Sequence, residues 1–159
     1  SEILKFNGAH ITLVSGGAAW ADHLAVRSFL EKLVPELELH LPAKFLNSKF
    51  IESKNRMDPG RIANFYHHQM YLKTGFTSLR ELQQAIDRGA KVTVSNGFHE
   101  RNHLVGEVDE LIAFTFGERS SVVGQGVSAQ YSGLKDGGTA HTWDNSLAPL
   151  KIHHNLHEL

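Results

Sequence analysis

Two glycine-containing segments hold the residues of this sequence that are best suited to chemistry. The first, 16–19 (Gly-Gly-Ala-Ala), follows an apolar, β-rich run, and the second, 137–140 (Gly-Gly-Thr-Ala), follows a later one. A glycine turn between a strand and a helix points backbone N–H groups beyond the strand end, where the helix dipole favours an anion. These two segments therefore predict a site for a phosphate-bearing ligand, most simply a nucleotide.

Polar side chains near these turns are candidate partners of such a ligand. Thr139 could donate its hydroxyl to a phosphate, Arg101 could pair with it bidentately, and Asn102 could hydrogen-bond a base or a ribose. Asp22 and Asp144 are the nearest candidate carboxylates for catalysis. Each residue has a simpler alternative role: Thr139 and Asn102 as helix caps, Arg101 as a surface charge, and Asp22 as a first-turn charge.

Histidines are numerous, and metal binding is the second chemistry to consider. The chain has 11 His, and His99 and His103 have a spacing that zinc sites use. There is no Cys, and we predict neither a metal site nor a cofactor. We expect the rings of Trp20, Phe29 and Phe114 to belong to the core rather than to a base-stacking surface.

Hydrophobic periodicity predicts alternating strands and helices. Ser78 and Glu81 read as a capping box, and Gly89 as a C-terminal cap. Alternation of this kind predicts an α/β fold with a mainly parallel sheet and helices on both faces, and such sheets bind ligands at their carboxyl edge. The expected strands are 9–15, 37–41, 91–95, 111–117 and 150–153, and the expected helices are 20–33, 61–74, 78–88, 98–108 and 139–147.

Length and composition indicate an ordinary soluble protein. The 159 residues are enough for one domain with a sizeable core, and 41% apolar with 21% charged residues is typical of globular chains. A net charge of -1 makes nucleic acid an unlikely partner. Because the sequence has no Cys, no signal peptide and no long apolar run, we expect a cytoplasmic protein without membrane contact. The aperiodic segment 118–135 reads either as a loop that folds over the ligand or as a disordered insertion.

Several segments, in the same order along the chain, resemble the SLOG superfamily, which includes the DprA/SMF and LOG proteins and the small YspA/YpsA-type domains. Segment 15–25 (SGGAAWADHLA) is similar to the family pattern "sGGArGADrlA", and 41–43 (LPA) is similar to "fPA". Arg101-Asn102 followed by 108–114 (VDELIAF) is similar to "RN…aDlliAF", and 136–140 (DGGTA) is similar to "GGTa". The stretch from about 47 to 97 looks like a helical insertion.

The resemblance implies one SLOG-like domain over 1–159, with a Rossmann-like three-layer sandwich that binds a nucleotide or nucleotide derivative. It also implies that the protein assembles into homo-oligomers. Two functions stay open: a module that senses or sequesters the ligand, and an enzyme like the LOG proteins, which cleave the N-glycosidic bond of nucleoside monophosphates. The LOG pattern has a Glu three positions after its Gly-Thr pair, whereas this chain has Thr142. Cleavage of a glycosidic bond needs a carboxylate near the anomeric carbon, so for an enzyme of this kind the candidates are Asp22 and Asp144, with Asp22 preferred. The expected ligand-binding residues are Gly16, Gly17, Ala18, Asp22, Arg101, Asn102, Gly137, Gly138, Thr139 and Ala140.

Overall fold

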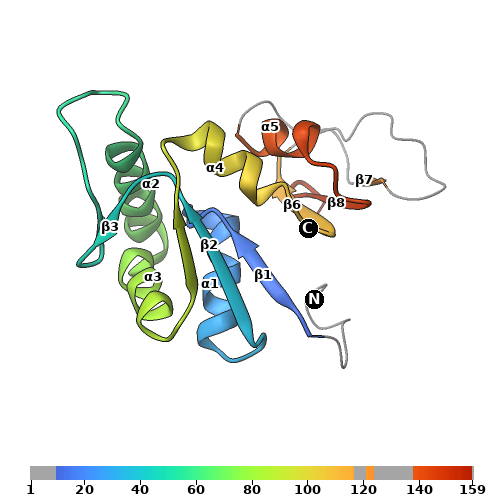
Figure 1. The fold of residues 1–159 in the computed structure, drawn as a ribbon, viewed down its shortest axis with the longest axis horizontal. Helices are drawn as coiled ribbons and strands as arrows, with labels where there is room; N and C mark the ends of the chain where they lie inside the picture. Colours follow the sequence, from blue (N-terminus) through green and yellow to red (C-terminus); the bar gives the residue numbers. More distant parts are fainter. Residues whose placement is uncertain (1–9, 117–120, 124–137, 159) are drawn as a thin grey trace. The chain divides into compact units, whose positions relative to one another are not determined.

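A computed structural model describes residues 10–116, 121–123 and 138–158 of the chain. The fold consists of two compact units, Ser1–Arg101 (unit 1) and Asn102–Leu159 (unit 2) (Figure 1). Both units mix helices with strands, and the three-stranded sheet of each unit contains at least one parallel strand pair, so the predicted α/β class is confirmed. The single SLOG-like domain, the insertion at about 47–97 and the three-layer sandwich stay predictions.

Unit 1 is built around a three-stranded parallel sheet in the order β1-β2-β5. Its strands are β1 (Thr12–Ser15), β2 (Glu36–Leu41) and β5 (Lys91–Val94), which run side by side in Figure 1. The short 3-10 helix η2 (Trp20–Asp22) and helix α1 (His23–Leu30) connect β1 to β2. All three strands were predicted, although β1 begins at Thr12 rather than at residue 9.

The core of unit 1 lies on the side of the sheet that α1 and α3 (Ser78–Asp87) cover. Leu37, Leu39 and Leu41 alternate along β2 and are buried in this core, as the two-residue period of a strand requires. The other members of this core are Val26, Phe50, Ala63, Leu82, Ala85 and Ala90.

Segment 43–60, where we expected no regular element, forms a hairpin and the start of a helix. Strands β3 (Phe45–Leu46) and β4 (Lys49–Phe50) pair antiparallel across Asn47 and Ser48, which both have positive φ, as in a two-residue hairpin turn. Helix α2 (Pro59–Thr74) begins two residues earlier than predicted. The reason is that Asp58 caps it by accepting the Arg61 N–H at 2.9 Å, while Pro59 occupies the first helical position.

Unit 2 is a second small sheet in the order β6-β8-β7. Strand β6 (Glu110–Thr115) pairs parallel with β8 (Leu150–Asn155), and β7 (Ser121–Val123) pairs antiparallel with β8. Helix α5 (Gly138–Asn145) leads into β8, and α4 (Phe98–Val105) contributes residues to both units. Of the predicted loop 118–135, only 121–123 falls within the described residues, and Gly137 also lies outside them.

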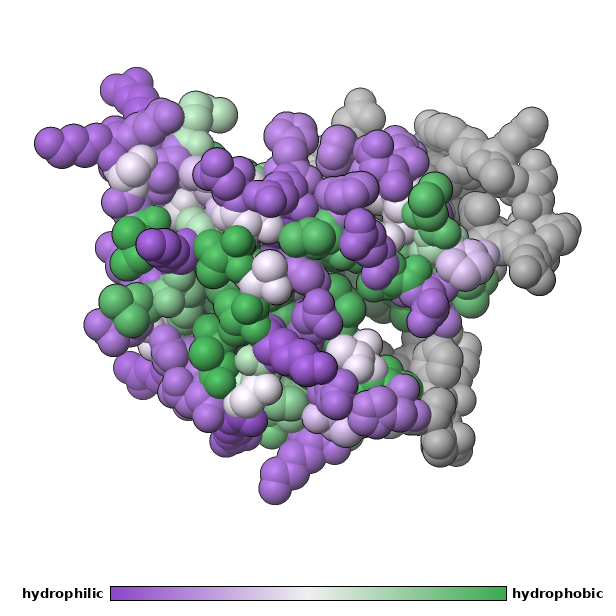
Figure 2. Space-filling model, in the orientation of Figure 1, coloured by the Kyte–Doolittle hydropathy of each residue, from purple (hydrophilic) through white to green (hydrophobic). Residues whose placement is uncertain are grey.

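The described surface is predominantly polar with scattered apolar side chains. Figure 2 shows hydrophobic residues gathered over the region of unit 1 around β5, α2 and α3, surrounded by hydrophilic ones. No helix within the described ranges combines the length and the apolar character that crossing a bilayer requires.

The core packing of unit 1 predicts that two leucines contribute very differently to the free energy of unfolding. Leu82 on α3 is 0% exposed, whereas Leu72 on α2 is 62% exposed. Leu82→Ala should lower the free energy of unfolding by about 3 kcal/mol, because it removes a buried side chain and leaves a cavity. Leu72→Ala should change it by less than about 0.5 kcal/mol. Urea denaturation followed by circular dichroism measures both, and equal losses would contradict the described packing.

Candidate functional site

The first predicted turn, 16–19, follows β1 and continues into η2. We call residues 16–22 the 16–22 turn. Gly17 has φ +64 and its N–H donates to Ser15 Oγ at 3.1 Å. The Ala18 N–H donates to Asp22 Oδ2 at 2.8 Å, so the carboxylate lies where an anion would meet this amide. Two of the backbone donors that we assigned to a phosphate therefore have partners inside the chain. Their assignment, and that of Asp22 as a catalytic group, stay predictions.

Arg101 on α4 lies against this turn and is largely buried. Its Nη1 donates to the Gly16 carbonyl at 3.1 Å and is 3.9 Å from Asp22 Oδ2, and its side chain is 12% exposed. Burial lowers the pKa of the Arg101 guanidinium, and the nearby Asp22 carboxylate offsets part of this effect. The guanidinium carbon also lies 5.3 Å from the centre of the Phe98 ring. Arg101 is thus a buried charge bound to the turn, and the alternative of a free surface Arg is wrong.

The pairing of this charge is incomplete. Arg101 Nε is buried and has no hydrogen-bond partner among the described residues. The same holds for the buried Ser95 Oγ, which follows the end of β5 at the carboxyl edge of the sheet. Buried polar atoms are nearly always hydrogen-bonded, so unpaired ones need an explanation. Two such atoms occur at the edge where parallel sheets bind ligands.

Gly16 has a steric function that the sequence did not indicate. A Cβ at this position would collide with Nη1 and Cδ of Arg101. The absence of a side chain at Gly16 therefore allows the guanidinium to reach the backbone of the turn.

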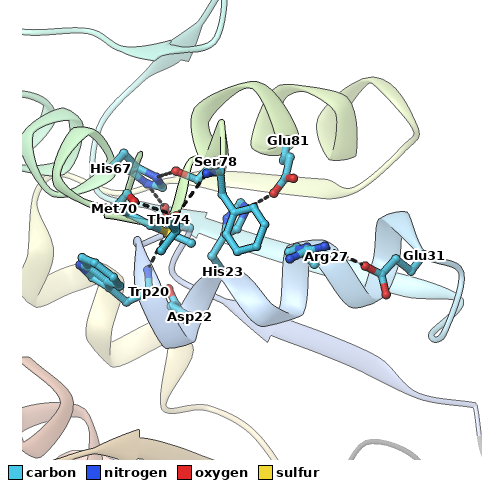
Figure 3. Close-up of polar contacts among 12 residues, drawn as sticks. Trp20, Asp22, His23, Arg27, Glu31, His67, Met70, Thr74, Ser78 and Glu81 are labelled. Carbon is cyan, nitrogen blue, oxygen red and sulfur yellow. Dashed lines mark hydrogen bonds and ion pairs between the residues drawn. The ribbon is translucent and has the colours of Figure 1, made fainter. Parts of the chain in front are cut away.

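A buried histidine from α2 also holds the turn (Figure 3). His67 Nε2 lies 3.0 Å from the Gly17 carbonyl, and His67 Nδ1 lies 2.8 Å from Ser78 Oγ. Because a carbonyl only accepts, Nε2 carries the proton, and the neutral ring accepts the Ser78 hydroxyl proton at Nδ1. The pKa of His67 is lowered to about 4, chiefly by burial; the Gly17 carbonyl opposes this shift, and the neighbouring His23 adds to it.

The predicted capping box of α3 is wrong, because its two side chains serve this network instead. Thr77 is the N-cap of α3 and makes no side-chain cap, Ser78 is the first helical residue, and Glu81 Oε2 lies 2.6 Å from His23 Nε2. The His23 and His67 rings meet edge to face, with centroids 6.2 Å apart. The 16–22 turn is thereby joined to α1, α2 and α3 through buried polar contacts.

Trp20 does not lie in the core, contrary to expectation. It is 41% exposed and has φ +68, an unfavourable conformation for a bulky residue. Its backbone N–H donates to Met70 Sδ, 3.2 Å away, and Lys73 Nζ is 6.0 Å from the centre of its ring. The expectation that Phe29 packs in the core of unit 1 is confirmed, since it lies partly buried against the core cluster.

The remaining predicted site residues belong to unit 2. Asn102 is buried, and a Cβ added to Gly138 would lie 3.7 Å from Asn102 Nδ2, so these two residues are near each other. Gly138 and Thr139 are exposed, and Ala140 is half-buried. Their roles, and the expectation that both glycine turns share one edge, stay predictions.

Sequence reasoning missed the role of two buried histidines beside the turn, His23 and His67. His67 shares the buried face of α2 with Ala63 and Met70, and His23 lies one helical turn before Val26, so helical spacing was the available signal. Within the described parts of the chain, no group of three or more His, Cys, Asp or Glu side chains is arranged to hold a metal ion.

The lowered pKa of His67 predicts a pH-dependent stability. Because the folded-state pKa of about 4 lies below the ordinary histidine value of 6.5, the contribution of His67 to stability is complete above pH 6.5 and is lost as pH falls toward 4. The loss should be at most roughly 3 kcal/mol. His67→Gln should flatten the slope of unfolding free energy between pH 6.5 and 4, whereas His68→Gln, at an exposed position, should not. Identical slopes in both variants and the wild type would contradict the burial of His67 as a neutral ring.

Comparison with known proteins identifies one relationship across nearly the whole chain. No family model matches the sequence, and no solved structure matches it. The uncharacterized protein R261 of Acanthamoeba polyphaga mimivirus is 40% identical over 155 residues, covering 96% of this chain and 75% of that protein. The match therefore runs through both units. The chain belongs to the same protein family as mimivirus R261.

Proposed function

We propose that this protein binds a nucleotide or another nucleotide-derived, phosphate-bearing small molecule, as a sensing or sequestering module. The phosphate would lie at the carboxyl edge of the β1-β2-β5 sheet, beside the 16–22 turn. The residues proposed to contact the ligand are Gly16, Gly17, Ala18, Asp22 and Arg101. Asn102 and the second turn, 137–140, stay predicted contacts of the same ligand.

The observation that carries this proposal is the buried, incompletely paired Arg101. Its guanidinium has a carbonyl at 3.1 Å and a carboxylate at 3.9 Å, while its Nε has no partner among the described residues. Leaving a buried charge under-paired is costly, and a phosphate is a strong, bidentate partner for an arginine. The adjacent turn follows a parallel strand and precedes a helix, which is the setting in which proteins bind phosphates.

The alternative function is an N-glycosidase acting on a nucleoside monophosphate, with Asp22 as its catalytic carboxylate. Asp22 favours this alternative because its side chain is 31% exposed beside Arg101. Two features favour binding without chemistry: Asp22 already accepts the Ala18 N–H at 2.8 Å, and Thr142 replaces the expected Glu.

The remaining finer expectations form part of the same proposal. We propose membership of the SLOG superfamily, a three-layer Rossmann-like sandwich, assembly into a homo-oligomer and a cytoplasmic location. Their support is the set of matching segments, the parallel sheet of unit 1 and the absence of Cys from the sequence. Size-exclusion chromatography with light scattering tests the oligomer directly.

Titration calorimetry with AMP, GMP, CMP and UMP tests the proposed function. We expect at least one of these to bind the wild-type chain, and Arg101→Gln to weaken that binding by about 10- to 100-fold, because a charge-assisted hydrogen bond is lost. Arg88→Gln is the matched control: Arg88 is exposed and caps the other end of α3, near the start of β5. It should alter the affinity by less than about twofold.

Two results would contradict the proposal: failure of all four nucleotides to bind, or equal affinities of the Arg101→Gln and wild-type chains. Circular dichroism establishes whether the variants are folded. If Arg101→Gln does not fold, Arg101→Lys, which retains the charge, takes its place. Incubation with the same nucleotides, followed by chromatography for free base, separates the two functions. If the wild type releases free base and Asp22→Asn does not, the protein is a glycosidase rather than a binding module.

A further inference from the structure

We propose that Trp20 is a stacking surface for the base of the bound nucleotide. The inference rests on the proposed function and deepens it, since it makes the ligand a nucleoside phosphate rather than a sugar phosphate or inorganic phosphate. The proposal concerns a residue whose side chain was predicted from the sequence to lie in the core.

The backbone of Trp20 has an unfavourable conformation that no core contact explains. At φ +68 a side chain meets its own backbone, and glycine or asparagine would adopt this conformation more easily. A tryptophan held in this way usually gains from deep burial, yet Trp20 remains 41% exposed. Residues held in rare backbone conformations are concentrated at functional sites, so the observed strain itself favours a functional role.

Contacts with α2 hold the main chain that carries the ring. The backbone N–H of Trp20 donates to Met70 Sδ at 3.2 Å, and Lys73 Nζ lies 6.0 Å from the ring centre. Figure 3 shows the ring projecting from the turn, away from His23 and Glu81. A half-exposed indole on an anchored main chain is well suited to stacking, because it offers an aromatic face.

The location of Trp20 relates it to the proposed phosphate site. It belongs to the same turn as Gly16, whose carbonyl binds Arg101, and as Asp22. The chain between Gly16 and Trp20 can span at most ~14 Å, which limits the distance between their Cα atoms. If the phosphate of a nucleotide lies at Arg101, its base can therefore extend toward the Trp20 ring.

Calorimetry with AMP, GMP, CMP, UMP and ribose 5-phosphate tests the proposal in three proteins: wild type, Trp20→Phe and Trp20→Asn. Asparagine tolerates positive φ but has no ring, whereas phenylalanine keeps a ring. For the tightest-binding nucleotide we expect Trp20→Asn to lose about 10- to 100-fold in affinity and Trp20→Phe to lose less than about threefold. Binding of ribose 5-phosphate should change by less than about threefold in both variants, because it has no base to stack.

Tryptophan fluorescence gives an independent reading. The chain has 2 Trp, and Trp143 is buried, so nucleotide should quench the wild type and leave Trp20→Phe, which retains only Trp143, unchanged. If Trp20→Asn binds the nucleotide as tightly as the wild type does, the stacking role is overturned, while the proposed function stands. An equal loss for ribose 5-phosphate would also overturn it, since Trp20 would then only support the turn. Failure of every nucleotide to bind the wild type would overturn the proposed function itself.

Discussion

The contact between the Arg101 guanidinium and the backbone of Gly16 governs the arrangement of this edge of unit 1. A buried charge is expensive unless it is well paired, and here the partners are one carbonyl and a carboxylate at 3.9 Å. The contact exists only because Gly16 has no side chain to obstruct it. An anionic ligand would complete the pairing, which connects the local geometry to the proposed function.

Segment 47–97 contributes the rest of the support for the 16–22 turn. His67 binds the Gly17 carbonyl, and Ser78 orients His67, so residues of α2 and α3 determine the conformation of a turn that precedes them by many positions. Strand β5 pairs with β2, and Phe50 and Leu82 lie in the core. Whatever its origin in the family, this segment is structurally integral to unit 1.

Periodicity predicted the order of the helices and strands because amphipathic patterns are local, and it failed where local signals were short or ambiguous. The hairpin at 45–50 depends on positive φ at Asn47 and Ser48, which leaves little trace in composition. The partners of Ser78 and Glu81 come from distant helices, so spacing alone suggested a cap instead. The exposed, positive-φ position of Trp20 does have a sequence signal, because the similar pattern "sGGArGADrlA" has glycine there. The burial of Arg101 depends on tertiary packing and could not be read from the sequence.

Nuclear magnetic resonance of the Arg101 Nε–Hε group offers the most direct test of the proposed anion site. In protein labelled with ¹⁵N, we predict that the tightest-binding nucleoside monophosphate shifts this resonance saturably and slows its exchange with water, while the Arg88 resonance is unaffected. The reason is that a phosphate would complete the pairing of this buried group. An Arg101 resonance that stays unmoved while the nucleotide saturates the protein would show that the anion binds elsewhere.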